Sequence, residues 1–242
     1  MRQALILAGG LGTRLRPVTQ RIPKVLMPVG ERFFLHYLLT MLVENGVRDV
    51  LLLIGHLGEQ VVEAVGDGAR YGCRVAYSVE PELLGTGGAI KNAAEKVHDE
   101  FFVLNGDTYL PLDYRALDQR WEQRRDELDG LLVVYDNSEP VAPGNVRLGG
   151  GDLVAEYRKH ADAEGGYVDA GVQVFKKAIL DMIPEGRVVS LEQEVFPKLI
   201  ADRRLGAYPT STRYYDIGTP ERLEAFERYI ASSGLDERGA AS

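Results

Sequence analysis

The sequence has a single cysteine, Cys73, and this scarcity excludes several kinds of protein. One cysteine cannot form an internal disulfide or a cysteine-based metal cluster. The four histidines are scattered without the spacing of metal ligands. No apolar run reaches the roughly 20 residues that cross a bilayer, and Met1 is not followed by a signal-peptide pattern. We therefore expect a cytoplasmic protein that does not bind membranes.

Positive charge is also scarce. The chain has 28 Lys and Arg against 36 Asp and Glu, a formal net charge of −8. This acidic excess argues against nucleic acid or an anionic membrane as the main partner. With 45% hydrophobic and 26% charged residues the composition is that of an ordinary globular protein, and 242 residues can bury a substantial core. A basic cluster in this chain is therefore a local feature.

Short apolar runs alternate with amphipathic stretches along most of the chain. We expect strands at 4–8, 49–54, 74–78, 100–104, 130–135, 168–175, 204–209 and 214–217, and helices at 34–44, 57–65, 88–97, 113–125, 177–182, 190–200 and 220–231. This order predicts an α/β fold, a doubly wound, mainly parallel, Rossmann-like sheet with helices on both faces. We predict a single domain at 1–231 and a mobile polar tail at 232–242.

The stretch 4–28 holds the clearest functional pattern. Its apolar run ends in a loop with three glycines, Gly9, Gly10 and Gly12. Without a Cβ, such a loop can bring successive backbone N–H groups close to a polyanion. Arg14 and Lys24 supply positive charge nearby. The stretch therefore predicts a phosphate-binding site.

The spacing of this site excludes two familiar phosphate loops. A P-loop needs a Gly, four residues and then Gly-Lys with a hydroxyl residue, and nothing between Gly9 and Lys24 fits. The dinucleotide fingerprint G-x-G-x-x-G begins at Gly10, but Leu15 stands at its third glycine. An NAD-dependent oxidoreductase is therefore disfavoured.

Three further stretches carry candidate site residues. A second cluster, Gly85, Gly87 and Gly88, is predicted to form a loop between a strand and a helix, where open α/β sheets bind ligands. Asp107 and Asp216 each end an apolar strand, where an acid has to be hydrated, capped or metal-bound. Because a helix is expected at 220, Asp216 could also be an acid that caps it.

These motifs together resemble the sugar-1-phosphate nucleotidyltransferase family. Its signature Gly-x-Gly-Thr-Arg, followed by Pro-Lys, stands here at 10–14 and 23–24. The stretches 84–91 (LGTGGAIK) and 104–108 (LNGDT) are most like those of D-glycero-α-D-manno-heptose 1-phosphate guanylyltransferases. Mannose 1-phosphate guanylyltransferases and N-acetylmuramate 1-phosphate uridylyltransferases resemble the chain almost as well. The resemblance implies a glycosyltransferase-A-like nucleotidyltransferase fold, with the nucleotide bound by 1–110 and the sugar phosphate by 111–231.

The resemblance also implies roles for single residues. Arg14 and Lys24 would be catalytic, and Asp107 and Asp216 would hold Mg²⁺. The nucleotide would be bound by Leu7, Gly9, Gly10, Gly12, Thr13, Glu80, Gly85, Thr86, Gly87 and Gly106. The sugar phosphate would be bound by Asn105, Asn145, Lys159, Asp169 and Gly171.

The implied reaction transfers a nucleotidyl group from an NTP to a sugar 1-phosphate and releases pyrophosphate. The attacking phosphate is already ionised, so the protein needs to position and neutralise the reactants and needs no nucleophilic side chain. Glu80 favours GTP, because its two acceptor oxygens match the N1–H and N2–H₂ donors of guanine. Uracil or thymine would be better matched by an amide.

Several alternatives stay open at this point. The sugar is uncertain because Arg158 stands where relatives have an acid, and Asp169 where an asparagine is common. A glucose 1-phosphate uridylyl- or thymidylyltransferase is a further alternative. A nucleotide-sugar-binding regulatory subunit without turnover is the alternative from a different class. A homodimer is also possible. We predict that Phe33 and Phe34 are exposed and that they form its contact together with the last helix.

Overall fold

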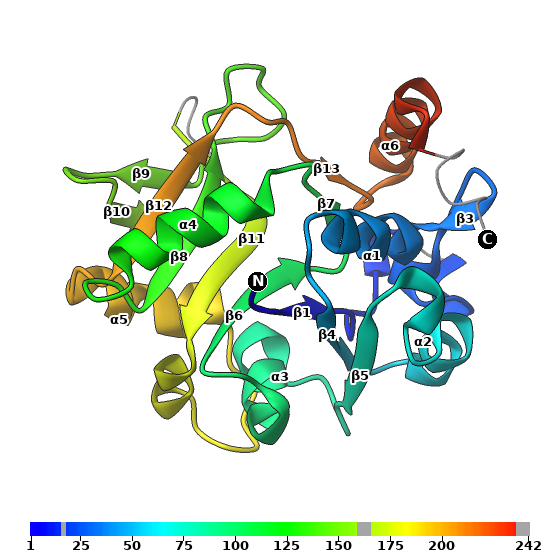
Figure 1. Ribbon diagram of the computed structural model, residues 1–242, viewed down its shortest axis with the longest axis horizontal. Helices are drawn as coiled ribbons and strands as arrows, with labels where there is room; N and C mark the ends of the chain where they lie inside the picture. The colour runs from blue at the N-terminus through cyan, green and yellow to red at the C-terminus, as the bar shows by residue number, and fades with distance from the viewer. Residues whose placement is uncertain (16–17, 159–165, 236–242) are drawn as a thin grey trace.

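A seven-stranded sheet runs through the molecule and takes strands from both halves of the chain (Figure 1). The computed structural model describes residues 1–15, 18–158 and 166–235. The strands of the sheet are β1 (Gln3–Leu7), β4 (Asp49–Ile54), β5 (Arg74–Val79), β6 (Glu100–Asn105), β8 (Gly130–Tyr135), β11 (Val168–Lys176) and β12 (Leu205–Thr210). Their spatial order is β12-β8-β11-β6-β1-β4-β5.

The sheet is mainly parallel, as predicted. The first strand, β1, lies between β4 and β6 and is parallel to both. The exception is β11, which is antiparallel to its neighbours β6 and β8. Because the parallel strands β1, β4 and β6 end at the same edge, the loops that follow them meet there.

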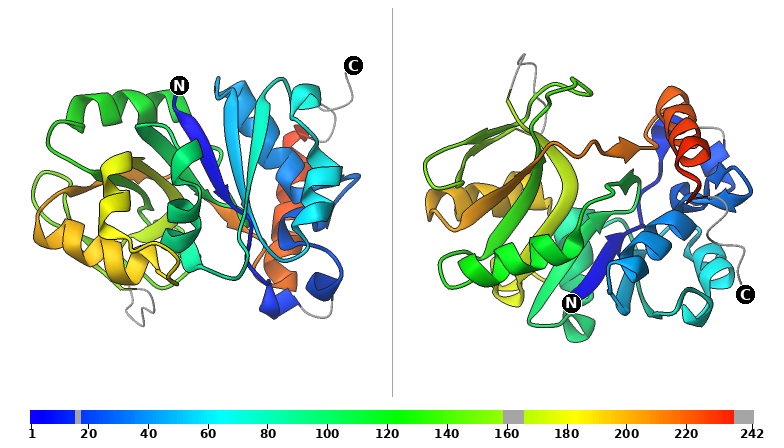
Figure 2. Two further views of the ribbon diagram at one scale, coloured as in Figure 1. Left: turned by 90° about the horizontal axis from the view of Figure 1, so that it is seen from below. Right: turned by 45° about the horizontal axis from the view of Figure 1, so that its top comes forward.

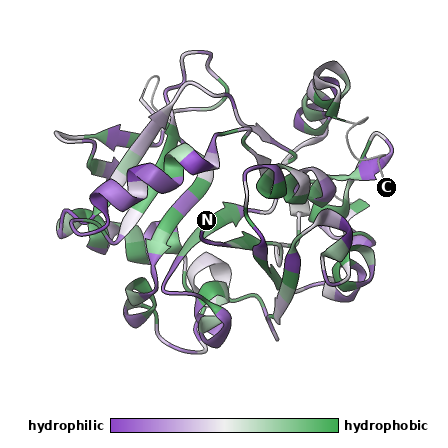
Figure 3. Ribbon diagram, viewed as in Figure 1, coloured by the Kyte–Doolittle hydropathy of each residue, from purple (hydrophilic) through white to green (hydrophobic). Residues whose placement is uncertain are grey.

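Helices cover both faces of the sheet (Figure 2). The helices are α1 (Phe34–Glu44), α2 (Gly58–Val65), α3 (Gly85–Asn92), α4 (Tyr114–Arg124), α5 (Phe196–Ala201) and α6 (Pro220–Ser233). Successive residues of β1 point to opposite sides: Ala4 and Ile6 pack with α1, α2, α4 and α6, whereas Leu5 packs with α3 and α5. Two apolar cores result. Figure 3 shows the matching pattern, with apolar strands inside and helices that are polar on their outer side.

Short elements connect this framework. The short strands are β2 (Pro28–Val29), β3 (Arg32–Phe33), β7 (Thr108–Tyr109), β9 (Val146–Leu148), β10 (Val154–Tyr157) and β13 (Tyr215–Asp216). The 3-10 helices are η1 (Thr13–Leu15), η2 (Val18–Gln20), η3 (Lys24–Leu26), η4 (Ala69–Tyr71), η5 (Ala94–Lys96) and η6 (Lys177–Met182), and η7 (Leu191–Val195) is a π-helix. Antiparallel pairing of β13 with β7 sets Asp216 opposite Thr108, next to Asp107.

Local chemistry explains where several helices begin. Asp113 caps α4, since its Oδ1 accepts hydrogen bonds from the N–H groups of Arg115 and Ala116 at 2.9 and 3.1 Å. Ser190 caps η7 through the N–H of Gln193 at 3.3 Å. At the other end of the chain, α6 continues to Ser233, so the first two residues of the tail predicted at 232–242 are helical. Residues 236–242 lie outside the described part.

One expectation about exposed residues is wrong. Phe34 is fully buried, and its ring packs on Phe226 of α6 with centroids 4.9 Å apart. Phe33 is partly buried. The pair therefore does not form the exposed apolar face that was expected for a homodimer. Among the helices that the structure describes, none has the length and hydrophobicity of a membrane span.

The buried face of α4 yields a stability prediction. The Tyr114 hydroxyl is fully buried and has no hydrogen-bond partner among the described residues. We expect Tyr114→Phe to raise the free energy of unfolding by about 1 kcal/mol, because it removes an unsatisfied polar group without changing the packing. Urea denaturation of the purified protein measures this change.

The matched control for this variant is Tyr135→Phe. Tyr135 is equally buried, but its hydroxyl donates to the Glu139 carbonyl at 3.1 Å and accepts from the Glu139 N–H at 3.2 Å. We expect this variant to lose about 1 kcal/mol. A loss of similar size for both variants would contradict the prediction.

Candidate functional site

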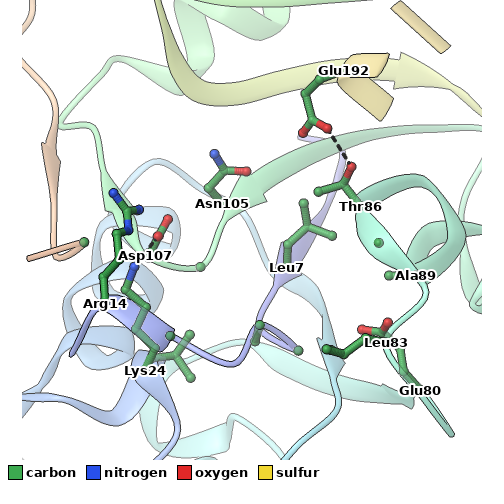
Figure 4. Close-up of a pocket in the computed structure, with 18 residues that line it drawn as sticks. Leu7, Arg14, Lys24, Glu80, Leu83, Thr86, Ala89, Asn105, Asp107 and Glu192 are labelled. Atoms are coloured by element: carbon green, nitrogen blue, oxygen red, sulfur yellow. Dashed lines mark hydrogen bonds and ion pairs between the residues drawn. The ribbon is translucent and has the colours of Figure 1, made fainter. Parts of the chain in front are cut away.

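A pocket of about 540 Å³ opens at the carboxyl ends of β1 and β6 (Figure 4). Most of the predicted nucleotide-binding and catalytic residues line it, together with Asn105, predicted for the sugar phosphate, and Asp107, predicted for the metal: Leu7, Gly9, Gly10, Gly12, Arg14, Lys24, Glu80, Gly85, Thr86, Asn105, Gly106 and Asp107. Thr13 begins η1 between Gly12 and Arg14. The structure therefore brings together the stretches around 7–24, 80–86 and 105–107.

Two glycines let the backbone pack closely beneath this pocket. The Gly106 N–H donates to the Leu7 carbonyl at 3.0 Å, and a Cβ on Gly106 would overlap that carbonyl oxygen. A Cβ on Gly9 would overlap Oε1 of Glu80. These glycines thus allow the Leu7 carbonyl and the Glu80 carboxylate to pack directly against the backbone. The closely packed groups form the floor of the pocket.

The signature turn has one open glycine. Gly12 has a φ of +57°, and its carbonyl accepts from the Leu15 N–H at 2.9 Å and from the Thr19 hydroxyl at 2.8 Å. Gly10 is exposed, and a Cβ built on it would meet nothing within 4 Å. A ligand can therefore approach the backbone most closely at Gly10.

The cations lie at one end of the pocket (Figure 4). Lys24 Nζ lies 2.5 Å from Asp107 Oδ2, with side chains that are 12% and 33% exposed. Arg14 lies beside Gly218, on which a Cβ would be 3.1 Å from Arg14 Nη2. This end can neutralise phosphate groups, since two cations face a single carboxylate.

Asp216, the second predicted metal ligand, lies just beyond this end. Its Oδ1 accepts from the Gly218 N–H and its Oδ2 from Arg222 Nη1, each at 2.8 Å. Backbone contact joins the two aspartate motifs, because the Ile217 N–H donates to the Asp107 carbonyl at 3.0 Å. The carboxylate of Asp216 is therefore engaged by Arg222, whereas that of Asp107 faces the pocket.

The donor set suits a metal that takes few protein ligands. In the described part of the chain, no three His, Cys, Asp or Glu side chains gather into a metal site. Mg²⁺ binds commonly through one or two carboxylates, with phosphate oxygens and waters completing its octahedron. Asp107 fits this requirement, and Asp216 would fit it once Arg222 releases the carboxylate.

Glu80 lies at the other end of the pocket. It is 8% exposed, and its Oε2 accepts from the Leu84 N–H at 3.0 Å. Burial raises the pKa of Glu80, and the backbone hydrogen bond opposes this shift. Leu83, 43% exposed, lies beside it on the pocket wall. An apolar side chain next to a buried acceptor suits a flat polar ring.

The second glycine cluster was predicted to be a loop, and this is wrong. Gly85, Gly87 and Gly88 lie in α3, where a short segment packs against them. We call this segment, residues 187–190, the strap. The Val189 N–H donates to Leu84, and the Val189 carbonyl accepts from Gly87 and Gly88 at 2.9 and 3.2 Å. A Cβ on Gly85 would lie 2.6 Å from the Val189 oxygen, so glycine is needed for the strap to dock.

The strap also changes the roles of these glycines. The N–H groups of Gly87 and Gly88 already have an acceptor in Val189, so neither is free to bind a ligand. Gly85 and Thr86 line the pocket, while Gly87 lies behind its wall against Val189 and Ile183. The cluster serves packing first and ligand binding second.

Three predicted sugar-phosphate residues form a network behind the pocket. Asn145 Oδ1 accepts from the Asp169 N–H at 2.8 Å. The Asp169 carboxylate accepts from the Tyr157 hydroxyl at 3.0 Å and the Gly171 N–H at 2.9 Å, and burial raises its pKa to about 6. A Cβ on Gly171 would lie 3.0 Å from Asn105 Nδ2. Gly171 therefore lies close to Asn105, which does line the pocket.

Two other residues of the sugar region have different outcomes. Lys159 lies outside the described residues. Arg158 donates to Glu156 Oε1 at 2.6 Å, and its side chain is 60% exposed, so it is engaged at the surface.

Several lining residues were missed by the sequence analysis: Ala8, Val25, Leu83, Ala89, Glu192 and Gly218. Most of them lie next to or within a predicted motif, although they were not themselves named as site residues. Glu192 is different, because it was assigned only to the start of a helix. It lies more than 100 residues from its hydrogen-bond partner Thr86, and no local signal connects the two.

A mainly parallel sheet with a glycine turn, two cations and an aspartate at its carboxyl edge defines a phosphate-binding α/β protein. The comparison with protein families makes this specific. The chain belongs to the nucleotidyl transferase family, whose model matches residues 3–233.

Two groups of curated relatives are similar to the chain. A mannose-1-phosphate guanylyltransferase of Mycobacterium tuberculosis is 37% identical over 223 residues, which are 90% of this chain and 61% of the relative. A D-glycero-alpha-D-manno-heptose 1-phosphate guanylyltransferase of Aneurinibacillus thermoaerophilus is 33% identical over 221 residues, 90% of this chain and 94% of the relative. The chain thus spans under two thirds of the first relative and nearly all of the second.

A solved structure shares the fold. HddC from Yersinia pseudotuberculosis, described as complexed with GMP-PN, superposes with a TM-score of 0.81 at 28% identity, covering 95% of this chain and 100% of HddC. The predicted nucleotidyltransferase fold is therefore confirmed.

The docking of the strap on α3 can be tested by one substitution. Gly85 has a φ of +73° and no room for a Cβ. We expect Gly85→Ala to lower the free energy of unfolding by about 2 kcal/mol or more, since left-handed strain alone costs about 1–2 kcal/mol. Gly150→Ala is the control, because a Cβ there meets nothing within 4 Å. Equal stability of the two variants in urea denaturation would refute the assignment.

Proposed function

We propose that the protein transfers a guanylyl group from GTP to a sugar 1-phosphate of the manno series, giving a GDP-sugar and pyrophosphate. The observation that carries this proposal is the separation of charge in the pocket. Arg14 and Lys24 lie at one end, and the buried acceptor Glu80 lies at the other (Figure 4). The names of the relatives support guanine and leave two sugars, D-glycero-α-D-manno-heptose and mannose. We favour the heptose, because the chain covers nearly the whole length of those relatives.

The proposed chemistry depends on charge neutralisation. The sugar phosphate oxygen attacks the α-phosphorus of GTP, and pyrophosphate leaves. Both reactants are polyanions, so the barrier falls when positive groups compensate their repulsion and the charge on the leaving group. Arg14 and the open backbone at Gly10 would bind the leaving phosphates. Lys24, oriented by its contact with Asp107, would lie between the two reacting phosphates.

Mg²⁺ is proposed as the cofactor. Asp107 would hold it together with phosphate oxygens and waters, and Asp216 would join once Arg222 releases its carboxylate. When bound, the ion supplies further charge neutralisation to the phosphates.

Glu80 is proposed to select the base. Its carboxylate would accept the N1–H and N2–H₂ donors of guanine, while Leu83 would cover the ring. Guanine donors would also compensate the burial that raises the pKa of Glu80. Since GTP and sugar phosphates are metabolites of the cytoplasm, we place the reaction there.

The catalytic role of Lys24 is tested by Lys24→Ala. We expect kcat/KM to fall by about 10²–10³-fold, the range seen when a group that stabilises transition-state charge is removed. The fold should stay intact, because Asp107 is one-third exposed and can be hydrated. Pyrophosphate release from GTP, Mg²⁺ and a panel of sugar 1-phosphates is measured. Lys198→Ala, on the exposed side of α5, is the matched control.

Near-normal turnover of Lys24→Ala would contradict the mechanism. No pyrophosphate release by the unmodified protein with any nucleotide and sugar would favour the regulatory subunit instead.

The base selectivity is tested by Glu80→Gln. We expect kcat/KM for GTP to fall by about 10–100-fold and that for UTP to change much less, because an amide leaves one guanine donor without an acceptor. Glu82→Gln is the control, since Glu82 is exposed two residues along the chain. An unchanged ratio of GTP to UTP would refute the role of Glu80.

A further inference from the structure

Asp216 is held by groups of the protein itself, although the proposed function needs this acid for a metal. Its Oδ1 accepts from the Gly218 N–H and its Oδ2 from Arg222 Nη1, each at 2.8 Å. The Asp216 side chain is 16% exposed, and that of Arg222 is 42% exposed. Both carboxylate oxygens therefore already have a donor, and one of these donors is a cation.

The start of α6 explains why Arg222 reaches this carboxylate. Thr219 caps the helix, since its hydroxyl accepts from the Arg222 N–H at 3.4 Å and its carbonyl from the Leu223 N–H at 2.9 Å. Side chains on an α-helix tilt towards its N-terminus. The strand before the cap, β13, ends at Asp216 (Figure 1). The first turn of α6 thus directs Arg222 back to Asp216.

Asp107, the other acid predicted to hold the metal, is engaged in a similar way. Its Oδ2 lies 2.5 Å from Lys24 Nζ, and its Oδ1 accepts from the Thr108 hydroxyl at 3.1 Å. The Ile217 N–H donates to the Asp107 carbonyl at 3.0 Å, which keeps the two acidic motifs adjacent. Each of the two acids is therefore paired with a cation.

Arg14 also lies close to Asp216. A Cβ on Gly218 would be 2.7 Å from Asp216 Oδ1 and 3.1 Å from Arg14 Nη2, so the two side chains approach the same point. Among the described residues at this end of the site, Arg14, Lys24 and Arg222 face two carboxylates. An excess of positive charge opposes a divalent cation and attracts phosphate.

We propose that Arg222 competes with the divalent cation for Asp216 and so keeps the metal affinity low until a nucleotide binds. This inference rests on the proposed function and adds a positioning residue to its metal site. A metal on Asp216 would lie beside the Arg222 guanidinium. Because the two positive charges repel, the arginine has to turn away, which lowers the metal affinity. The phosphates of a nucleotide offset this repulsion, so metal and nucleotide are expected to bind together.

Arg222→Gln tests the competition. It removes the charge of a side chain that is 42% exposed, and an ion pair at such a site adds little to stability, so the variant should fold. Electron paramagnetic resonance measures Mn²⁺ binding without nucleotide or sugar. We expect the Mn²⁺ dissociation constant to fall by about tenfold, because a repelling charge beside the metal is removed. Arg222→Lys keeps the charge and should stay close to the unmodified protein.

Arg213→Gln is the matched control. The Arg213 side chain is 45% exposed, but it pairs with Glu139 at 3.7 Å and lies over the Tyr215 ring. The variant therefore loses the same charge three residues before Asp216 without removing a contact to that acid. We expect it to change the Mn²⁺ dissociation constant by less than about threefold, since salt and solvent screen exposed charges.

An Asp216→Asn background separates competition for this acid from a general change in charge. In that background, Arg222→Gln should alter the Mn²⁺ dissociation constant by less than about threefold, because the group for which the two cations compete is gone. A gain of equal size with and without the Asp216 carboxylate would overturn the proposal. An unchanged constant in Arg222→Gln alone, or no Mn²⁺ binding by that variant, would overturn it as well.

The Mn²⁺ measurement does not depend on turnover, so its outcome is separate from that of the proposed function. Tighter Mn²⁺ binding by Arg222→Gln, without pyrophosphate release by the unmodified protein, would support the competition and refute the catalytic function. Turnover together with an unchanged Mn²⁺ constant in the variant would support the catalytic function and refute the competition.

Discussion

The three adjacent parallel strands β1, β4 and β6 are each followed by a glycine. Because glycine has no side chain, neighbouring segments of the protein pack directly against the backbone at these positions. Gly55 packs on Gly9, with a hypothetical Cβ only 3.3 Å from the Gly9 carbonyl oxygen. Gly9 in turn leaves room for Glu80, and Gly106 leaves room for the Leu7 carbonyl. A side chain at any of these positions would force neighbouring backbone or the Glu80 carboxylate apart. The floor of the pocket, and with it the spacing between Glu80 and the Lys24–Asp107 pair, depends on these close approaches.

The separation of charge follows from this floor. Lys24 and Asp107 come from segments 83 residues apart, yet β1 and β6 are neighbours, so the loops after them meet. The charged pair is worth little to stability, because Asp107 is one-third exposed and solvent screens it. The pair instead orients the Lys24 side chain. A lysine held by a carboxylate has fewer conformations to lose if a phosphate binds, as the proposed function requires. Asp216 is held in place in the same way, by its contact with Arg222 beside Arg14.

Periodicity was sufficient to predict most of the fold. The bounds of α1, β4 and β8 agree with those expected, because each is a continuous apolar or amphipathic stretch that ends at turn-forming residues. The prediction of a loop at the glycine cluster failed. Glycine disfavours helices locally, and only the docking of Val189 explains a helix there. The prediction that Phe34 is exposed failed because the local sequence gives no sign of the Phe226 ring that covers it. Glu192 could not be predicted, as its partner Thr86 is distant in sequence.

The strap also bears on the separation of phosphate and base that the proposed function assumes. A helix that begins with glycines after a parallel strand commonly binds phosphate through its first N–H groups. In α3 the N–H groups of Gly87 and Gly88 donate to the Val189 carbonyl, which removes donors that an anion would need. Glu80 adds a carboxylate close to this helix start, since its Oε2 accepts from the Leu84 N–H. Among the described residues, an anion is therefore favoured at the other end, where Gly10 is open and Arg14 and Lys24 line the pocket. Under the proposed function, a nucleotide would therefore bind with its triphosphate at the glycine turn of residues 10–12 and its base against α3.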